Sequence, residues 1–326
     1  MTGRVIVSID GKKLSDIEKN LVSHPNTAAI LLFTRNFANK EQLRSLISEI
    51  QTFAKKDDLP IFVDQEGGQI QRFQGHGFTN LESFKDIGAN PSLIQQHAKA
   101  LTNDLAEFGI ISLTPVVDLD LGNSVISGKN RSFSRNPKEV SRITREYITA
   151  LNMHGHSATL KHFPGHGQLY PNGQDDSHFC LPIDQRDLTS ITNSDLIPFI
   201  ENLSLADAIM PAHILYPNID SKNTVGFSYV WLEEILRNKY GYKGIIVSDC
   251  LSMAGAGTNS MLEKTNNSLE LVDIAIMCNI SATESLKVLD NLANGQLSAA
   301  REPYFKKWTE FGRLTRAELK LNSVTI

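Results

Sequence analysis

The sequence predicts an α/β protein built as a single (β/α)8 barrel of the TIM type. Two observations support this prediction: short apolar, β-branched runs recur along the chain, and amphipathic segments with helical spacing separate them. The apolar character of each run is nearly continuous, which is typical of strands buried on both faces of a parallel sheet. Eight such runs favour a closed barrel over an open, doubly wound sheet, which is the alternative architecture.

The eight predicted strands follow one another with a helical segment or a loop between them. They cover Val5–Ile9, Ala28–Phe33, Pro60–Asp64, Ile110–Pro115, Ala158–His162, Ala206–Pro211, Gly244–Asp249 and Ile274–Cys278. Because no linker, internal repeat or low-complexity segment interrupts them, residues 1–326 are predicted to form one domain. In such a barrel the functional groups gather at the C-terminal ends of the strands. Ionisable side chains lie at these ends: Asp64, Asp118, Lys161, His162, His213 and Asp249.

Amphipathic spacing predicts four helices around residues 43–50, 94–108, 140–151 and 231–236. Asn136 and Pro137 are expected to be the N-cap and the first residue of the third helix, and Gly241 is expected to end the fourth. A last helix, folding back on the barrel, is predicted after Gly295 from the spacing of Phe305, Trp308, Phe311 and Leu314.

The composition limits the compartment and the partners. A net charge of −4 with no basic cluster predicts no binding to nucleic acid or to an anionic membrane surface. Three widely spaced cysteines, at positions 180, 250 and 278, form neither a disulfide framework nor a Cys-x-x-Cys metal site, and they suit a reducing cytoplasm. Asp10 interrupts the first apolar run too early for a signal peptide, and no run is long enough to span a bilayer. We expect a cytoplasmic protein, monomeric by default, that acts on a small molecule.

The densest group of titratable side chains lies in residues 159–178. This stretch contains the run KHFPGHG and ends in Asp175-Asp176-Ser177-His178. Gly167, Pro171 and Gly173 make its middle a loop, and loops held by a rigid scaffold often carry catalytic residues. A solvated surface loop is the alternative. Asp176, two residues before His178, can orient the imidazole so that it gives and takes a proton near neutral pH.

Two further stretches place ionisable groups directly after strands. The glycine pair of Asp64-Gln65-Glu66-Gly67-Gly68 permits a tight turn with positive φ, and the acids favour a ligand-binding role over a plain turn. Asp249 ends an apolar strand, where an ionisable group is often functional; capping of the next turn is the alternative. Strand alternation then predicts that Cys250 points away from the barrel mouth, towards the helices. Arg131, in a polar loop, is either a donor to hydroxyls and carbonyls or an ordinary surface arginine.

A carboxylate nucleophile with a histidine as acid and base would be a variant of the two-carboxylate arrangement of glycoside hydrolysis. The runs DQEGG with its QRF, RSF, KHFPGHG, DSH and SDxLSM resemble, in order and context, the bacterial β-N-acetylglucosaminidases of glycoside hydrolase family 3, in their single-domain type. The resemblance covers nearly the whole chain, including Phe33-Thr34-Arg35-Asn36 and Met210-Pro211-Ala212-His213.

The resemblance implies a retaining hydrolase without cofactor or metal. It would remove β-1,4-linked N-acetylglucosamine from anhydro-muropeptides during peptidoglycan recycling in the cytoplasm. It implies that Asp249 is the catalytic nucleophile, that His178 is the acid/base, and that Asp176 is the partner of this histidine. The residues that would hold the sugar are Asp64, Arg72, Arg131, Lys161 and His162.

Three departures from the family pattern concern the rate and the fine specificity. Cys250 stands where a second aspartate usually follows the nucleophile, and Gln69 stands where a basic residue usually follows the glycine pair. The segment after Met253 lacks the usual Ala-Gly-Cys-Asp run before the last strand.

Three other functions remain as alternatives. A metal-dependent hydrolase would use the histidines as ligands, although His154 and His156 precede the fifth strand instead of following the first. A non-enzymatic carbohydrate sensor would keep Asp64, Arg131 and Lys161 but lack turnover. A phosphorylase would use phosphate in place of water as the acceptor. Chelators and the turnover of an aryl N-acetylglucosaminide would separate these functions.

Overall fold

The computed structural model describes residues 3–54, 59–168, 170 and 175–293. The helix predicted after Gly295 lies outside these ranges, as do Pro171 and Gly173 of the loop.

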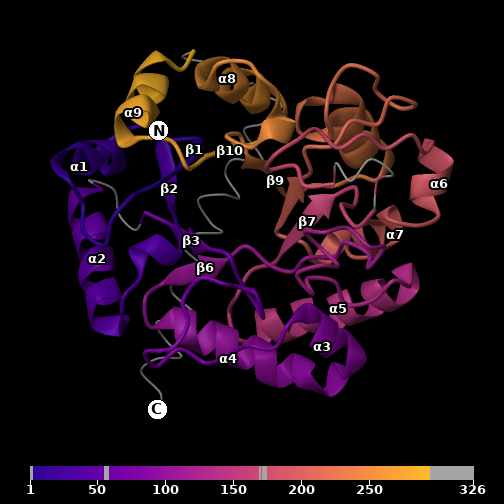
Figure 1. Ribbon diagram of the computed structural model, residues 1–326, viewed down its shortest axis with the longest axis horizontal. Coiled ribbons are helices and arrows are strands. Elements are labelled where there is room, and N and C mark those ends of the chain that lie inside the picture. Colours follow the sequence, from indigo (N-terminus) through magenta and orange to yellow (C-terminus); the bar gives the residue numbers. More distant parts are fainter. Residues whose placement is uncertain (1–2, 55–58, 169, 171–174, 294–326) are drawn as a thin grey trace.

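Eight parallel strands curl into a barrel (Figure 1). They are β1 (Val5–Ser8), β2 (Thr27–Leu32), β3 (Ile61–Val63), β6 (Ile110–Ser112), β7 (Thr159–Phe163), β8 (Ala208–Pro211), β9 (Ile245–Cys250) and β10 (Ile274–Met277). The hydrogen-bonded order is β6-β3-β2-β1-β10-β9-β8-β7. The segment after β6 closes the ring on β7, because Thr159 N donates to Thr114 O at 2.7 Å and Val117 N donates to Lys161 O at 2.9 Å. The predicted barrel is confirmed, and the open sheet is excluded.

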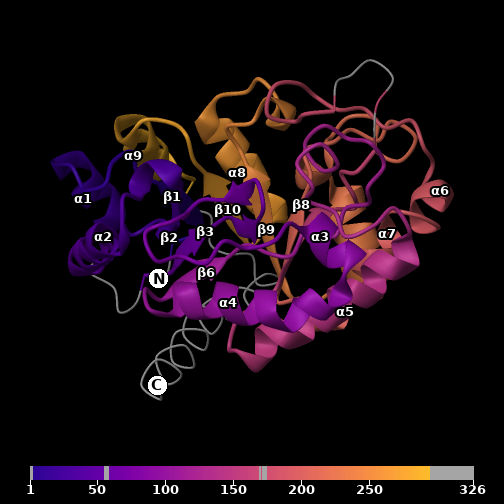
Figure 2. The same cartoon turned by 60° about the horizontal axis from the view of Figure 1, so that its bottom comes forward.

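Helices surround the strands, as the two views in Figures 1 and 2 show together. They are α1 (Asp16–Ser23), α2 (Lys40–Phe53), α3 (Phe84–Ala89), α4 (Ile94–Ala106), α5 (Pro137–Met153), α6 (Leu188–Thr192), α7 (Leu196–Ile200), α8 (Met261–Leu271), α9 (Ala282–Asn291) and a π-helical segment, Val230–Lys239. All four helices predicted before the tail are present. The side chain of Asn136 caps α5 by accepting from the backbone of Lys138 and Glu139, as predicted.

Apolar side chains fill two layers, one inside the barrel and one between the strands and the helices. The inner layer contains Ile6, Phe62, Ile111 and Ile276, which are all buried. The outer layer is larger and packs the apolar faces of the helices on the strands. Because the interior is filled, a ligand cannot pass through the barrel and must bind at a rim.

A short hairpin follows β3 and is made of β4 (Gln65–Gly67) and β5 (Ile70–Gln71). Its turn needs glycine, since Gly67 has φ +102° and a Cβ there would lie 2.1 Å from the carbonyl oxygen of Glu82. The predicted positive φ is therefore confirmed, and close packing against the chain near Glu82 explains it.

Candidate active site

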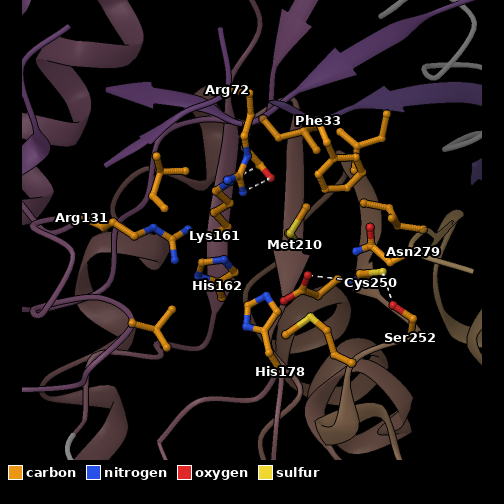
Figure 3. Close-up of a pocket in the computed structure, with 18 of the residues that line it drawn as sticks. Phe33, Arg72, Arg131, Lys161, His162, His178, Met210, Cys250, Ser252 and Asn279 are labelled. Carbon is orange, nitrogen blue, oxygen red and sulfur yellow. Dashed lines mark hydrogen bonds and ion pairs between the residues drawn. The ribbon is translucent and has the colours of Figure 1, made fainter. Parts of the chain in front are cut away.

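A cavity of about 520 Å³ opens at the C-terminal ends of the strands. Seven of the eight predicted site residues line it: Asp64, Arg72, Arg131, Lys161, His162, His178 and Asp249. The eighth, Asp176, contacts His178. Figure 3 shows Lys161 and His162 on one side of this cavity, with Cys250 and Ser252 on the opposite side and Met210 between them. The strand-end argument therefore brings together residues that are far apart in the sequence.

The side chain of Lys161 is a buried cation held by two carboxylates. Its Nζ lies 2.8 Å from Asp64 Oδ1 and 2.8 Å from Glu66 Oε1, and only 2% of the side chain is exposed. Burial alone would lower the pKa of Lys161, but the two carboxylates outweigh it and the net shift is upward. Burial would raise the pKa of Asp64, yet Lys161 and Arg72 lower it further, so this carboxylate is ionised at neutral pH.

Glu66 fixes a second cation of the cavity, and sequence reasoning assigned it no role of its own. Its carboxylate accepts two hydrogen bonds from Arg131, from Nε at 2.8 Å and from Nη2 at 2.8 Å. Although burial raises the pKa of Glu66, Arg131 and Lys161 bring it down to about 2. The available signal was the spacing of Asp64 and Glu66, because residues two apart in an extended chain lie on the same side.

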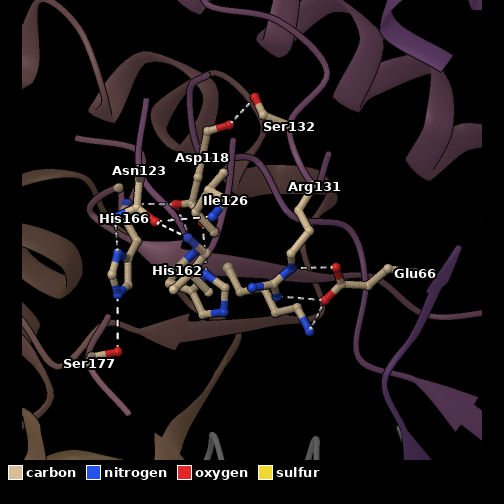
Figure 4. A network of polar contacts seen from close by, with 12 residues as sticks. Glu66, Asp118, Asn123, Ile126, Arg131, Ser132, His162, His166 and Ser177 are labelled. Carbon is tan, nitrogen blue, oxygen red and sulfur yellow. Dashed lines mark hydrogen bonds and ion pairs between the residues drawn. The ribbon is translucent and has the colours of Figure 1, made fainter. Parts of the chain in front are cut away.

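Asp118 contacts both histidines of the KHFPGHG run: it holds the ring of His162 and the backbone of His166 (Figure 4). Its carboxylate lies 2.8 Å from His162 Nδ1 and accepts the backbone N–H groups of His162 and His166 at 3.1 Å and 2.8 Å. Burial would raise the pKa of Asp118, but His162 outweighs it and the net shift is downward. Because Nδ1 of His162 contacts Asp118, Nε2 is the ring nitrogen left for a ligand.

His178 forms the predicted pair with Asp176, with 2.7 Å between His178 Nδ1 and Asp176 Oδ1. More than half of the histidine side chain, 54%, is exposed, so it can reach a ligand in the cavity. Burial would raise the pKa of Asp176, and the hydrogen bonds from His178 lower it below its usual value. The carboxylate is therefore the acceptor of this pair.

The segment that carries the pair is anchored on both flanks. Asn123 Nδ2 donates to Asp175 O at 3.0 Å, and Ser124 N donates to Asp175 Oδ2 at 2.6 Å. On the other flank Gly255 N donates to Ser177 O at 2.9 Å, and Ser177 Oγ lies 3.1 Å from His166 Nε2. His166, one of the histidines considered as metal ligands, thus connects the strand end at β7 to the segment that carries the His178–Asp176 pair.

Asp249 lies at the end of β9 and faces the cavity, as predicted. Burial would raise the pKa of Asp249, but His162 and His213 outweigh it, and the net shift is downward. Its Oδ1 accepts the backbone N–H of Cys250 at 2.7 Å. The result is an ionised, half-buried carboxylate that faces the cavity.

The prediction that Cys250 points towards the helices is wrong. β9 bulges against β10, because Val247 pairs with Ile274 while Cys250 pairs with Ile276, so three steps along β9 match two along β10. Strand alternation therefore breaks, and Cys250 lines the cavity beside Asp249.

No group of three His, Cys, Asp or Glu side chains in the described ranges is arranged to hold a metal ion. His156, one of the ligands considered for a metallohydrolase, is buried and bonded within the core instead. It accepts Ser112 N–H at Nε2, and its Nδ1 lies 2.7 Å from Ser157 O.

Comparison with known proteins places the chain in a family. Residues 4–303 match the Glycosyl hydrolase family 3 N terminal domain. The chain belongs to glycosyl hydrolase family 3. This family 3 chain is 40% identical over 290 residues to a Beta-hexosaminidase of Neisseria meningitidis, covering 85% of the chain and 78% of the relative. It is 37% identical over 289 residues to a Beta-hexosaminidase of Bordetella avium, with 85% and 81% covered.

Solved structures agree with the family and the fold. Native NagZ from Neisseria gonorrhoeae superposes on the family 3 chain with a TM-score of 0.83 at 33% identity, covering 98% of this chain and 97% of the other. The same relative in complex with N-trifluoroacetyl-D-glucosamine gives a TM-score of 0.85 at 34% identity, with 100% and 94% covered.

Proposed function

We propose that this family 3 chain is a retaining exo-β-N-acetylglucosaminidase that releases β-1,4-linked N-acetylglucosamine from anhydro-muropeptides in the cytoplasm, during peptidoglycan recycling. One observation carries the proposal: the carboxylate of Asp249 and the His178–Asp176 pair meet at one cavity whose other side is a cluster of ionised hydrogen-bonding groups. The relatives named Beta-hexosaminidase support the same reaction class.

The sugar would be held by Asp64, Arg72, Arg131, Lys161 and His162. Carboxylates and cations with fixed geometry suit the donor and acceptor capacity of sugar hydroxyls and of an acetamido group. Because Asp64 and Glu66 already fix Lys161 and Arg131, these cations do not have to be ordered when the sugar binds.

In the first step Asp249 attacks the anomeric carbon while His178 gives its proton to the glycosidic oxygen. The carbon–oxygen bond to the leaving group breaks, and the sugar becomes an ester of Asp249. Since Nδ1 of His178 is bonded to Asp176, Nε2 is the nitrogen that transfers the proton. The carboxylate of Asp176 stabilises the imidazolium form that the acid step needs.

In the second step a water molecule attacks the anomeric carbon and gives a proton to His178 Nε2. The ester bond breaks, the sugar leaves with retained β configuration, and the Asp249 carboxylate is restored. One histidine thus acts first as an acid and then as a base.

The charge of the cavity supports an anionic substrate such as a muropeptide. Two carboxylates line it, those of Asp64 and Asp249. Five cationic side chains also line it: Arg72, Lys129, Arg131, Lys161 and Lys264. Asp64 and the buried Glu66 pair with Lys161, Arg131 and Arg72, so the positive charge left for a ligand comes from Lys129 and Lys264, and it favours ligands that carry carboxylates. No helix of the described ranges is long and apolar enough to cross a membrane.

The deciding experiment is turnover of an aryl β-N-acetylglucosaminide and of a β-1,4 disaccharide, with NMR of the first-formed product. Retention predicts the β anomer first, and Asp249→Asn should abolish the reaction in a folded protein. Activity should survive EDTA. No turnover would favour the carbohydrate sensor, and an α anomer as the first product would exclude the ester intermediate. Loss of activity in EDTA that only a divalent cation restores would favour the metallohydrolase. Formation of a sugar 1-phosphate in the presence of phosphate would favour the phosphorylase.

A further inference from the structure

The bulge in β9 puts a thiol in the cavity next to the proposed nucleophile. Cys250 Sγ lies 3.1 Å from Ser252 Oγ (Figure 3). It also lies 3.7 Å from the carbonyl oxygen of Cys278. Neither the resemblance nor the proposed reaction assigns this thiol a role. Its position on the opposite side of the cavity from Lys161 and His162 makes it reachable by any molecule that enters.

A buried lysine in the lining of the same cavity favours the binding of an anionic ligand. Lys264, in the first turns of α8, lines the cavity and is only 8% exposed. Within the described ranges no carboxylate lies within ion-pair distance of its ammonium group, and the hydrogen bond it makes, to Gly257 O, is long at 3.4 Å. Burial lowers the pKa of Lys264, with Cys250 and Glu284 opposing this shift. A buried cation without a counter-ion is stabilised when a ligand supplies one.

The surroundings also favour the reactive form of the thiol. A hydrogen bond from the Cys278 side chain, and not the contact with its carbonyl oxygen, lowers the pKa of Cys250; burial opposes this shift, and Ser252 lowers the pKa again, to about 7. A lowered pKa raises the thiolate fraction at neutral pH above that of an ordinary cysteine, and the thiolate is the nucleophile in thiol–disulfide exchange.

We propose that Cys250 is a modification site for small disulfides that carry carboxylates, with Lys264 as the residue that attracts their charge. The Cys250 sulfur attacks one sulfur of the disulfide, a new bond joins Cys250 to that half, and the old sulfur–sulfur bond breaks. The other half leaves as a thiolate and takes a proton from solvent. The adduct occupies the cavity beside Asp249 and blocks the sugar site.

The other two cysteines are poorer targets, which gives the chain its own controls. Cys278 is fully buried behind Cys250. Cys180 is half-buried, burial raises the pKa of its thiol, and its Sγ donates to Asp176 O at 3.2 Å. Modification should therefore be selective for Cys250.

The test treats the full chain with oxidised glutathione and reads the product by intact mass and peptide mapping. One adduct is expected, on the peptide with Cys250, and dithiothreitol should remove it. Cys180→Ser should still take the adduct, whereas Cys250→Ser should not. No adduct, or an adduct on Cys180, would overturn the proposal. Because mass detects the adduct, the result stands even if the proposed glycosidase activity fails.

The charge requirement is tested with a matched pair of reagents. The exchange rate is measured with oxidised glutathione and with the neutral bis(2-hydroxyethyl) disulfide, and the first rate is divided by the second. Lys264→Met should lower this ratio by about tenfold, and high salt should lower the same ratio in the wild type. Lys243→Met, a lysine outside the cavity lining, should leave the ratio unchanged. An equal loss with both reagents would overturn the role of Lys264. Inhibition, measured on an aryl N-acetylglucosaminide, should follow the extent of the adduct and reverse with it; turnover that persists in fully modified protein would contradict the blocking role.

Discussion

Glu66 holds Arg131 in a bidentate pair, with 2.8 Å between each of its carboxylate oxygens and a guanidinium nitrogen. The same carboxylate lies 2.8 Å from Nζ of Lys161, so one buried acid positions two cations of the proposed sugar site. The pair is almost fully removed from water, with 2% of the Glu66 side chain and 10% of the Arg131 side chain exposed.

Glu66→Gln should therefore weaken both the fold and sugar binding. It leaves two buried cations short of a counter-charge, which costs about 3 kcal/mol in the free energy of unfolding. We expect KM to rise more than kcat falls, because neither reacting group is removed. Denaturant unfolding and steady-state kinetics would measure both effects. Glu146→Gln, at the exposed pair with Arg142, is the matched control and should cost less than about 0.5 kcal/mol.

Asp249 should form a covalent glycosyl-enzyme. A 5-fluoro N-acetylglucosaminyl donor with a good leaving group slows both steps, so the ester can accumulate. Mass spectrometry of the digested protein should place the sugar on the peptide that contains Asp249. Asp249→Asn should give no adduct. Inactivation without an adduct would indicate that the acetamido oxygen of the substrate attacks in place of the enzyme.

Loss of the acid should depend on the leaving group. His178→Ala should slow the cleavage of a disaccharide about a hundredfold or more, because a sugar leaves poorly without a proton. A nitrophenyl glycoside should be affected less than about tenfold, since nitrophenolate leaves unaided. Single-turnover rates for the two substrates would measure the difference. His154→Ala, outside the cavity lining, is the control, and equal losses on both substrates would mean that His178 binds instead of transferring protons.

Stability should fall as the pH drops from about 6.5 towards 4. Burial lowers the pKa of His156 to about 4, and Ser112 N–H donates to its Nε2, so the folded protein holds the neutral ring. The unfolded chain, with a pKa near 6.5, takes up the proton first, so stability present above this value is lost on acidification. His156 alone should account for about 2 kcal/mol between pH 7 and pH 5. Urea unfolding at both pH values would measure this change in the free energy of unfolding. His156→Gln removes the titrating group, so the change should be smaller in this variant; an equal change in the variant and the wild type would contradict the assignment to His156.

The strands and most site residues were predictable because their signals are local. A parallel strand buried on both faces is a continuous apolar run, and an ionisable residue that ends such a run is easy to see, as at Asp64 and Asp249. The helices α1, α3, α6, α7, α8 and α9 were not predicted, and none of them is longer than the 11 residues of α8, so each gives only a short periodic signal.

The features that could not be predicted from the sequence depend on contacts between residues far apart along the chain. Glu66 and Asp118 are recognisable as acids near strand ends, but their roles come from contacts with Arg131 and His162, 65 and 44 residues away. The orientation of Cys250 depends on the register between β9 and β10, which no local pattern encodes. Alternation along one strand is a rule for regular pairing, and a bulge suspends it.

The bulge also changes how this enzyme family member can diverge. A regular strand end offers one side chain to a cavity for every two residues, whereas β9 offers two neighbours, Asp249 and Cys250. Position 250 can thus exchange its chemistry while position 249 stays in place. A saturation library at this one position would therefore vary the lining of the cavity beside an unchanged Asp249.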